Sequence, residues 1–302
     1  MVTVKEGELS EGKAGDELLL QELYDYLAEN DLADREGYAG YAELVDLQSY
    51  MDYMCFNIYI DNMDFREDKN SFWWRSREVT TKPYEDGKWR FLVYDLDAME
   101  WGDAHMWGLE SQAEKNSFTL MPRYNADQPI DQQPIFAALK KNPAFAKQFV
   151  LTFMDMVNTN FRYDHVQKVL SDYGPVGPYY HGGNGGTQST EYYEEFFRTR
   201  ASYIVPYMAE EFSLKGTQET LHLGINDPDA GRIRLNTILP DLSQGDWSGN
   251  YYTDFPVTVT AIAEEGYVFK GWSGSVSSTE ESLEVSLRTG GASLYAVFEK
   301  ET

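Results

Sequence analysis

Residues 88 to 102 read KWRFLVYDLDAMEWG, an apolar and aromatic run that leads into two aspartates one residue apart, Asp95 and Asp97. Aspartate is a poor strand residue, and burying its carboxylate is costly unless a cation or several hydrogen-bond donors meet it. In a strand, residues i and i+2 point to the same face, so both carboxylates could be directed at one point. The run therefore predicts a strand whose end carries a carboxylate pair suited to a divalent metal ion.

The composition is that of a folded and strongly acidic protein. The 302 residues are 42% hydrophobic and 15% aromatic, which is enough for one large or two ordinary domains. The 50 acidic and 25 basic residues give a formal net charge of −25. Because nucleic acid binding requires a basic surface, this charge argues against a nucleic acid partner. The single cysteine, Cys55, allows no internal disulfide.

Targeting signals are not evident in the sequence. It has no apolar run of membrane-spanning length and no signal peptide. Its acidic opening is typical of a chain that begins inside a longer protein, so an export signal could be encoded upstream.

The pattern of the sequence changes near residue 216 and predicts an α+β protein in two parts, residues 1–215 and 216–302. Before this point, the spacing of apolar residues indicates a mainly helical domain. The expected helices cover residues 16–30, 47–60, 133–141, 143–161, 164–174 and 192–212, the last of them kinked or broken near Pro206. Asp16 and Asp164 are the expected N-terminal caps of the first and fifth of these. After residue 216, short runs of β-branched and aromatic residues separated by Gly, Asp, Asn and Ser predict a small all-β domain.

Four segments of the first part, in this order, resemble the CotH family of atypical protein kinases, which were first known from spore coats. They are the buried helix at 47–60, DNMDFREDKNSFWW at 61–74, KWRFLVYDLDAMEWG at 88–102 and NPAFAKQFVLTFMDMVNTNF at 142–161. The resemblance covers about residues 15–215 and implies a kinase-like large lobe.

The end of the chain resembles a divergent InlB B-repeat module. It carries the run GYVFKGWSG at residues 266–274 and an Ala-Val-Phe ending at residues 296–298. Such modules are usual on secreted and surface proteins of bacteria, so the resemblance implies a secreted or cell-surface location.

The kinase resemblance implies a role for each polar residue around the quoted run. Phosphoryl transfer needs a carboxylate near the attacking hydroxyl, and an Asn and an Asp that hold the magnesium ions on the nucleotide phosphates. By similarity, Asp64 is the catalytic residue, Asn70 and Asp95 are metal ligands, and Asp97 is a direct or water-mediated ligand. The spacing from Asp64 to Asn70 is one residue longer than in the familiar kinase loop, so Asp68 or a loop bulge stays open as an alternative. The implied cofactors are Mg²⁺, or another divalent cation, and ATP.

A kinase also needs a small lobe whose lysine contacts the phosphates, and the family places that lobe before residue 15. This chain has no room for it, and the glycine-rich run at 182–186 lacks the Lys-Ser/Thr ending of a phosphate loop. We therefore expect the complete protein to phosphorylate Ser or Thr of a protein substrate, and this chain alone to be inactive. The alternative is a non-catalytic scaffold or adhesion protein with a surface partner, in which Asp64, Asp68 and Asn70 only form a turn between a helix and a strand.

Overall fold

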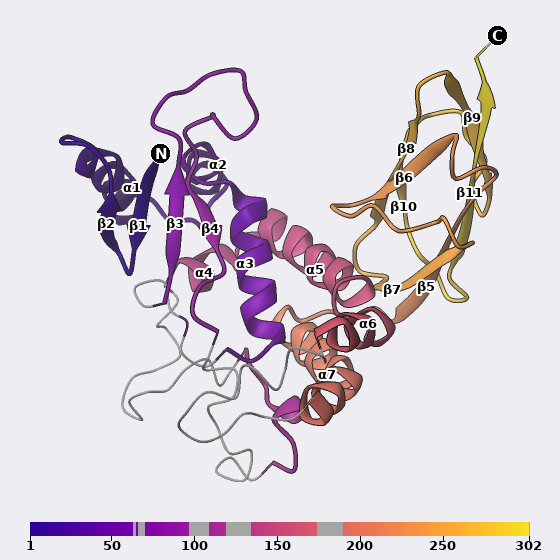
Figure 1. The fold of residues 1–302 in the computed structure, drawn as a ribbon, viewed down its shortest axis with the longest axis horizontal. Helices are drawn as coiled ribbons and strands as arrows, with labels where there is room; N and C mark the ends of the chain where they lie inside the picture. Colours follow the sequence, from indigo (N-terminus) through magenta and orange to yellow (C-terminus); the bar gives the residue numbers. More distant parts are fainter. Residues whose placement is uncertain (63–64, 66–69, 97–108, 119–133, 174–189, 302) are drawn as a thin grey trace. The chain divides into compact units, whose positions relative to one another are not determined.

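The computed structural model describes residues 1–62, 65, 70–96, 109–118, 134–173 and 190–301 (Figure 1). Contacts divide the chain into two compact units. One comprises Met1–Phe149 and His181–Met208, and the other comprises Val150–Tyr180 and Ala209–Thr302. Helices dominate the first part of the chain and strands the last part, so the predicted α+β class is confirmed.

The first unit contains a four-stranded antiparallel sheet and most of the helices. The strand order is β2 (Glu8–Glu11), β1 (Val2–Lys5), β3 (Phe72–Arg75) and β4 (Arg90–Leu92). The helices in this unit are α1 (Glu17–Glu29), α2 (Arg35–Leu44), α3 (Leu47–Tyr59), α4 (Pro134–Leu139), the first half of α5 (Pro143–Asn158) and most of α7 (Thr190–Glu211). A short 3-10 helix covers Gln112–Glu114.

Helix α3 is the predicted buried helix and lies beside β4 in Figure 1. It begins after Asp46, whose carboxylate accepts a hydrogen bond of 3.1 Å from the backbone N–H of Ser49, as an N-terminal cap does. Its Tyr50 and Tyr53 rings meet Phe91 of β4 at centroid distances of 5.0 and 5.6 Å. Aromatic packing therefore fixes the helix against the strand that leads to the predicted site.

The structure changes three expectations about helices. Asp164 is wrong as a cap, because it lies inside the first turn of α6 (Tyr163–Tyr173) rather than before it. Asp16 stands at the N-cap position of α1, as expected, but its side chain makes no capping hydrogen bond, because it pairs with Arg77 and accepts a hydrogen bond from the N–H of Lys13. Helix α7 continues through Pro206 to Glu211, so it is not broken there, and a kink at Pro206 stays a prediction.

The second unit contains two sheets that face each other. Their strand orders are β7 (Trp247–Tyr252), β5 (Gln218–Ile225), β11 (Ala292–Lys300), β9 (Tyr267–Gly274), and β10 (Ser282–Val285), β8 (Val257–Ala263), β6 (Gly231–Leu235). Burial alternates along β6, β8 and β11, so each sheet has one buried face. A Cβ added at Gly231 would lie 2.6 Å from the Phe298 ring, which shows how closely the sheets approach. Trp272 is buried here, and its indole N–H donates to the Glu280 carbonyl.

The second unit also contains the end of α5 and helix α6, which join the strands through buried polar contacts. Asp155 of α5 is 0% exposed and accepts hydrogen bonds from the Tyr251 hydroxyl (2.7 Å), the Asn236 amide (2.9 Å), and the N–H and hydroxyl of Thr237 (3.2 and 2.9 Å). Asn158 exchanges two hydrogen bonds with the backbone of Asn250. The proposed boundary between residues 215 and 216 stays a prediction, since this unit holds residues from both sides of it.

The buried Asp155 carboxyl should make stability depend on pH. Burial raises its pKa to about 6 despite the donors around it. A carboxyl whose pKa is raised on folding contributes stability below its unfolded pKa, near 4, and loses that contribution as the pH rises through the folded pKa. The free energy of unfolding of the wild type, relative to Asp155→Asn, should therefore fall by up to about 3 kcal/mol between about pH 4 and pH 7.

Urea denaturation of both proteins across this pH range would measure that difference, and taking the difference cancels the other carboxyl groups. A constant or rising difference would show that the donors hold the carboxylate ionised at all of these pH values.

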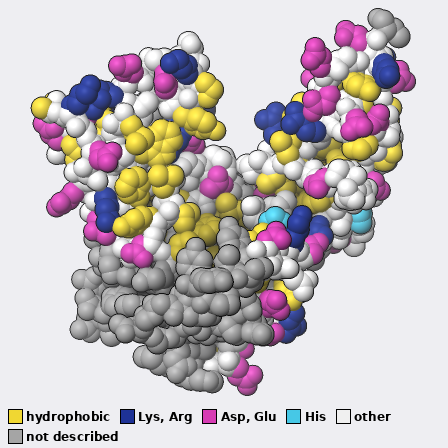
Figure 2. All heavy atoms as spheres, in the orientation of Figure 1, with side chains coloured by type: hydrophobic (Ala, Val, Ile, Leu, Met, Phe, Trp, Pro, Cys, Tyr) yellow, Lys and Arg dark blue, Asp and Glu magenta, His cyan; other side chains and the backbone are white. Residues whose placement is uncertain are grey.

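Charged side chains are intermingled on the face drawn in Figure 2. Lys and Arg lie singly or in small groups among Asp and Glu, over the strands of both units. No helix in the described part of the chain has the length and apolar character needed to cross a membrane.

Candidate active site

Asn70 and Asp95 are the predicted site residues that the structure describes. Asp64, Asp68 and Asp97 lie outside the described residues. Asn70 is buried and Asp95 is exposed, and both have a left-handed backbone, with φ of 53° at each. Asn and Asp tolerate this conformation better than other non-glycine residues. The backbone conformation alone is therefore a reason for Asn and Asp at these two positions, besides any chemical role.

The predicted strand through Asp95 and Asp97 is wrong at Asp95. Strand β4 ends at Leu92, and Leu92 pairs with Phe72, the first residue of β3. Beyond this pair the neighbouring strand has ended, and aspartate itself disfavours an extended backbone. The argument that alternate residues share one face of a strand therefore does not apply to Asp95.

The antiparallel pairing of β3 and β4 nevertheless brings the two site segments to one end of the sheet. Asn70 lies just before β3 and Asp95 just after β4. Because Phe72 is opposite Leu92, the chain leaves the sheet at the same end on both sides of this pair. The pairing of β3 with β4, and not a strand that runs through Asp95, therefore brings the Asn70 and Asp95 segments to one end of the sheet.

Polar side chains near the end of α3 hold both segments. The Tyr53 hydroxyl donates to the Asn70 carbonyl (3.4 Å), and the Asn62 amide donates to the Asp95 carbonyl (3.3 Å). The Asn62 amide also donates to Asn57 Oδ1 (2.9 Å), and Asn57 donates to the Tyr53 carbonyl (2.8 Å). Asn57 and Asn62 are both buried. These two residues were not predicted from the sequence. Asn57 could have been, because it is a polar residue among the apolar residues of a buried helix.

A cation lies beside the Asp95 segment. The Lys5 amine of β1 is 4.8 Å from the centroid of the Tyr94 ring. A hydrogen bond with Tyr94 is the largest cause of the raised pKa of Lys5, and the charges of Glu6 and Asp95 contribute. Lys5 pairs with Phe72 across the sheet, so β1 brings it to this site from a distant part of the sequence. Its position could not be predicted because strand pairing, not local pattern, determines it.

Directly after α3, Asp61 forms a buried ion pair. Its carboxylate accepts hydrogen bonds from Lys115 Nζ (3.2 Å), Ser117 Oγ (2.7 Å) and the Gln112 amide. Burial lowers the pKa of Lys115, and the Asp61 charge opposes that effect. This pair joins the end of α3 to the segment around the 3-10 helix.

Arg200 of α7 completes this buried cluster. It is 0% exposed and donates to four backbone carbonyls and to Ser117 Oγ. The carbonyls belong to Ile58 (3.2 Å), Tyr59 (2.8 Å), Ala113 (2.8 Å) and Lys115 (2.6 Å). The last carbonyls of a helix carry negative partial charge, so a guanidinium at the end of α3 is favourable. Arg200 thus fixes the point from which the chain leaves α3 toward Asn62 and the predicted catalytic segment.

The described donor set suits a hard cation. Asn70 contributes an amide oxygen and Asp95 a carboxylate, and oxygen ligands of these kinds are those that Mg²⁺ prefers. Asp95 is exposed, and Asn62, three residues after the end of α3, holds this segment through the Asp95 carbonyl. No group of three or more His, Cys, Asp or Glu converges as metal ligands within the described residues, which do not include Asp64 and Asp97.

The first part of the chain is mainly helical and carries Asn70 and Asp95 at one end of an antiparallel sheet, and the last part is rich in strands, so the chain is an α+β protein. Residues 3–204 match the model of the CotH kinase protein family, and the chain belongs to that family. Residues 242–302 match the divergent InlB B-repeat domain, so both resemblances predicted from the sequence are confirmed in their order. This second match covers β7 to β11, and β5 and β6 precede it. No curated protein and no solved structure matches the chain.

Proposed function

We propose that this chain is the metal-binding catalytic part of a CotH protein kinase, which in the complete protein transfers phosphate from ATP to Ser or Thr of a protein substrate. One observation carries the proposal. Asn70 and Asp95, the residues matched to the metal-binding roles, lie beyond the same end of one sheet, and their carbonyls accept hydrogen bonds from Tyr53 of α3 and from Asn62, just after α3.

Each residue then has a defined task. Asp64 would accept the proton of the substrate hydroxyl, and Asn70 and Asp95, with Asp97, would hold Mg²⁺. The metal would neutralise charge on the transferring phosphoryl group. Lys5 would add a positive charge toward the nucleotide phosphates in a protein whose net charge is −25.

We also infer that the protein acts at the cell surface or outside the cell, because divergent InlB B-repeat modules are usual on such proteins. Fractionation of the source cells would test this, and recovery of the protein only from the cytoplasm would contradict it.

Magnesium should stabilise the chain through Asp95. A ligand that binds only the folded state stabilises it by about 2.7 kcal/mol at one hundred times its Kd. Thermal denaturation with and without Mg²⁺ should show a rise in Tm for the wild type and little rise for Asp95→Asn. The matched control is Asp25→Asn on the exposed side of α1, which should keep the full rise.

The proposed metal binding is contradicted if Mg²⁺ raises the Tm of neither protein, or if it raises the Tm of wild type and Asp95→Asn equally. Transfer of radiolabelled phosphate by the complete protein tests the activity separately. If the complete protein binds Mg²⁺ and ATP but transfers no phosphate, the non-catalytic scaffold is the better reading.

A further inference from the structure

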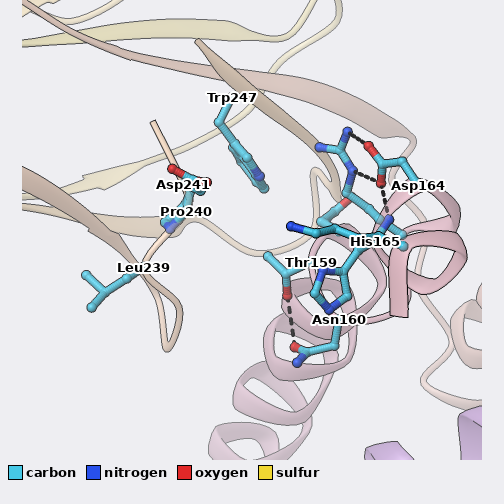
Figure 3. A pocket seen from close by; sticks show the side chains of 11 residues that line it. Thr159, Asn160, Asp164, His165, Leu239, Pro240, Asp241 and Trp247 are labelled. Carbon is cyan, nitrogen blue, oxygen red and sulfur yellow. Dashed lines mark hydrogen bonds and ion pairs between the residues drawn. The ribbon is translucent and has the colours of Figure 1, made fainter. Parts of the chain in front are cut away.

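The second unit contains a pocket of about 450 Å³, a size typical of small-molecule sites (Figure 3). One wall comes from the turn between α5 and α6 and from the first turns of α6. The other comes from the segment that leads into β7 and from Trp247 at its start. In Figure 3, Asn160 and His165 lie on the helical wall, while Asp241 and Trp247 lie across the pocket from them.

Trp247 presents an indole N–H donor to this pocket. The residue is only 7% exposed, and its indole N–H has no hydrogen-bond acceptor within the part of the chain that the structure describes. Its nitrogen is not sealed in the core, unlike those of Trp73 and Trp89. Since its ring points from β7 toward α6, the N–H is available to a ligand in the pocket (Figure 3).

Two further basic side chains, Lys168 and His165, lie exposed on the helical wall. Arg162 is satisfied by Asp164, with hydrogen bonds of 3.1 and 2.7 Å. By contrast, the side chains of Lys168 and His165 have no ion pair or hydrogen bond among the described residues. The pocket therefore offers an ammonium, an imidazole and an indole N–H, which together suit an anionic group.

The opposite side offers acceptors. One oxygen of Asp241 accepts a hydrogen bond from the Ser243 N–H (2.9 Å), which leaves acceptor capacity on the carboxylate. A hydrogen bond with Ser243 lowers the pKa of Asp241, and the positive charge of Lys168 lowers it further. The ammonium and the carboxylate therefore interact electrostatically. A bare anion would be repelled by Asp241, and a neutral sugar would make no use of the positive charge of Lys168. A ligand with both an anionic group and hydroxyls satisfies both walls.

We propose that this pocket binds a small acidic sugar, one that carries a carboxylate or a phosphate. Lys168, His165 and the Trp247 N–H bind the anionic group, and Asp241 and the Asn160 amide bind hydroxyls. The site lies in the second unit and does not depend on the proposed kinase activity.

Calorimetric titration of the full chain with glucuronate and with glucose 6-phosphate tests the proposal and distinguishes the two anionic groups. At least one of them should bind about tenfold or more tightly than both glucose and inorganic phosphate. Lys168→Met should weaken that binding about tenfold or more, and Trp247→Phe, which removes the N–H, about two- to tenfold. Lys300→Met, an exposed lysine at the end of β11, should leave it unchanged.

Thermal denaturation would verify that each variant is folded, and Lys168→Met is at an exposed position. Failure of both acidic sugars to bind overturns the proposal. Equal binding of inorganic phosphate, or binding that Lys168→Met does not weaken, also overturns it.

Discussion

Arg200→Met should lower the free energy of unfolding of the first unit by about 3–5 kcal/mol, the range found when one partner of a buried charged network is removed. The substitution keeps a long apolar stem but removes the guanidinium donors of four backbone carbonyls, of which the Ile58 carbonyl keeps the backbone N–H of Asp61 (3.3 Å). It also removes a positive charge close to the buried Asp61 carboxylate, whose charge influences the pKa of Arg200. Each buried polar group left unsatisfied costs about 1–3 kcal/mol, so the expected total is a large share of ordinary stability.

The matched control is Arg198→Met on the same helix. Arg198 pairs with Glu195, and both side chains are about half exposed. Exposed ion pairs contribute about 0–1 kcal/mol to stability, so the free energy of unfolding of this variant should remain close to that of wild type. Arg200→Lys should be intermediate, because an ammonium keeps the charge but cannot reproduce the five donors of a guanidinium. Urea denaturation measures all three, and a cost below about 1 kcal/mol for Arg200→Met would contradict the structural role.

Arg200 also connects stability to the candidate active site. Two of the carbonyls it binds, those of Ile58 and Tyr59, end α3, and Asn62, whose amide holds the Asp95 segment, follows four residues after Ile58. Arg200→Met, under conditions where it remains folded, should therefore show a smaller rise of Tm with Mg²⁺ than Arg198→Met shows. An unchanged rise would mean that the cluster stabilises the unit without positioning the site.

The sequence predicts six of the seven α-helices that the structure describes, because their signal is local, and it misses α2 (Arg35–Leu44). The apolar spacing over residues 47–60 depends only on neighbours in the chain, and α3 lies there with the expected residues buried. The same holds for the alternating runs of β6, β8 and β11. Strand β7, which contains Trp247, carries Ser, Gly and Asn and was not among the predicted runs, because pairing with β5 rather than its own pattern makes it a strand.

The candidate site could be predicted only in part, because distant segments build it. Asn70 and Asp95 were predicted as site residues from a resemblance to a family, but the strand that was expected to run through Asp95 ends at Leu92. Strand pairing places Lys5 beside Tyr94, and a hydrogen bond places Asn62 beside Asp95. Similarly, nothing local separates the buried Arg200 from the exposed Arg198 two residues earlier. Such positions depend on contacts across more than thirty residues of sequence.

The second large effect is expected at Asp155, where a single carboxylate joins α5 to the strands of the second unit. Asp155→Leu keeps the branching of the side chain at Cγ and introduces no new polar group, although its methyl groups are bulkier than the carboxylate oxygens. It leaves the Tyr251 hydroxyl, the Asn236 amide and the Thr237 N–H and hydroxyl without their acceptor. With about 1–3 kcal/mol for each unsatisfied buried group, partly offset by the apolar side chain, we expect a loss of about 3–5 kcal/mol.

A double-mutant cycle with Tyr251→Phe would show that this loss comes from orphaned donors and not from poor packing. Tyr251 is fully buried, and both burial and the neighbouring Asp155 raise the pKa of its hydroxyl. Once Asp155→Leu is present, the hydroxyl has lost its acceptor, so removing it with Tyr251→Phe should cost little or even restore stability. The double variant should therefore lose less than the sum of the two single losses, by about 1 kcal/mol or more. Additive losses, or an Asp155→Leu variant within about 1 kcal/mol of wild type in urea denaturation, would show that these hydrogen bonds do not hold α5 to the strands.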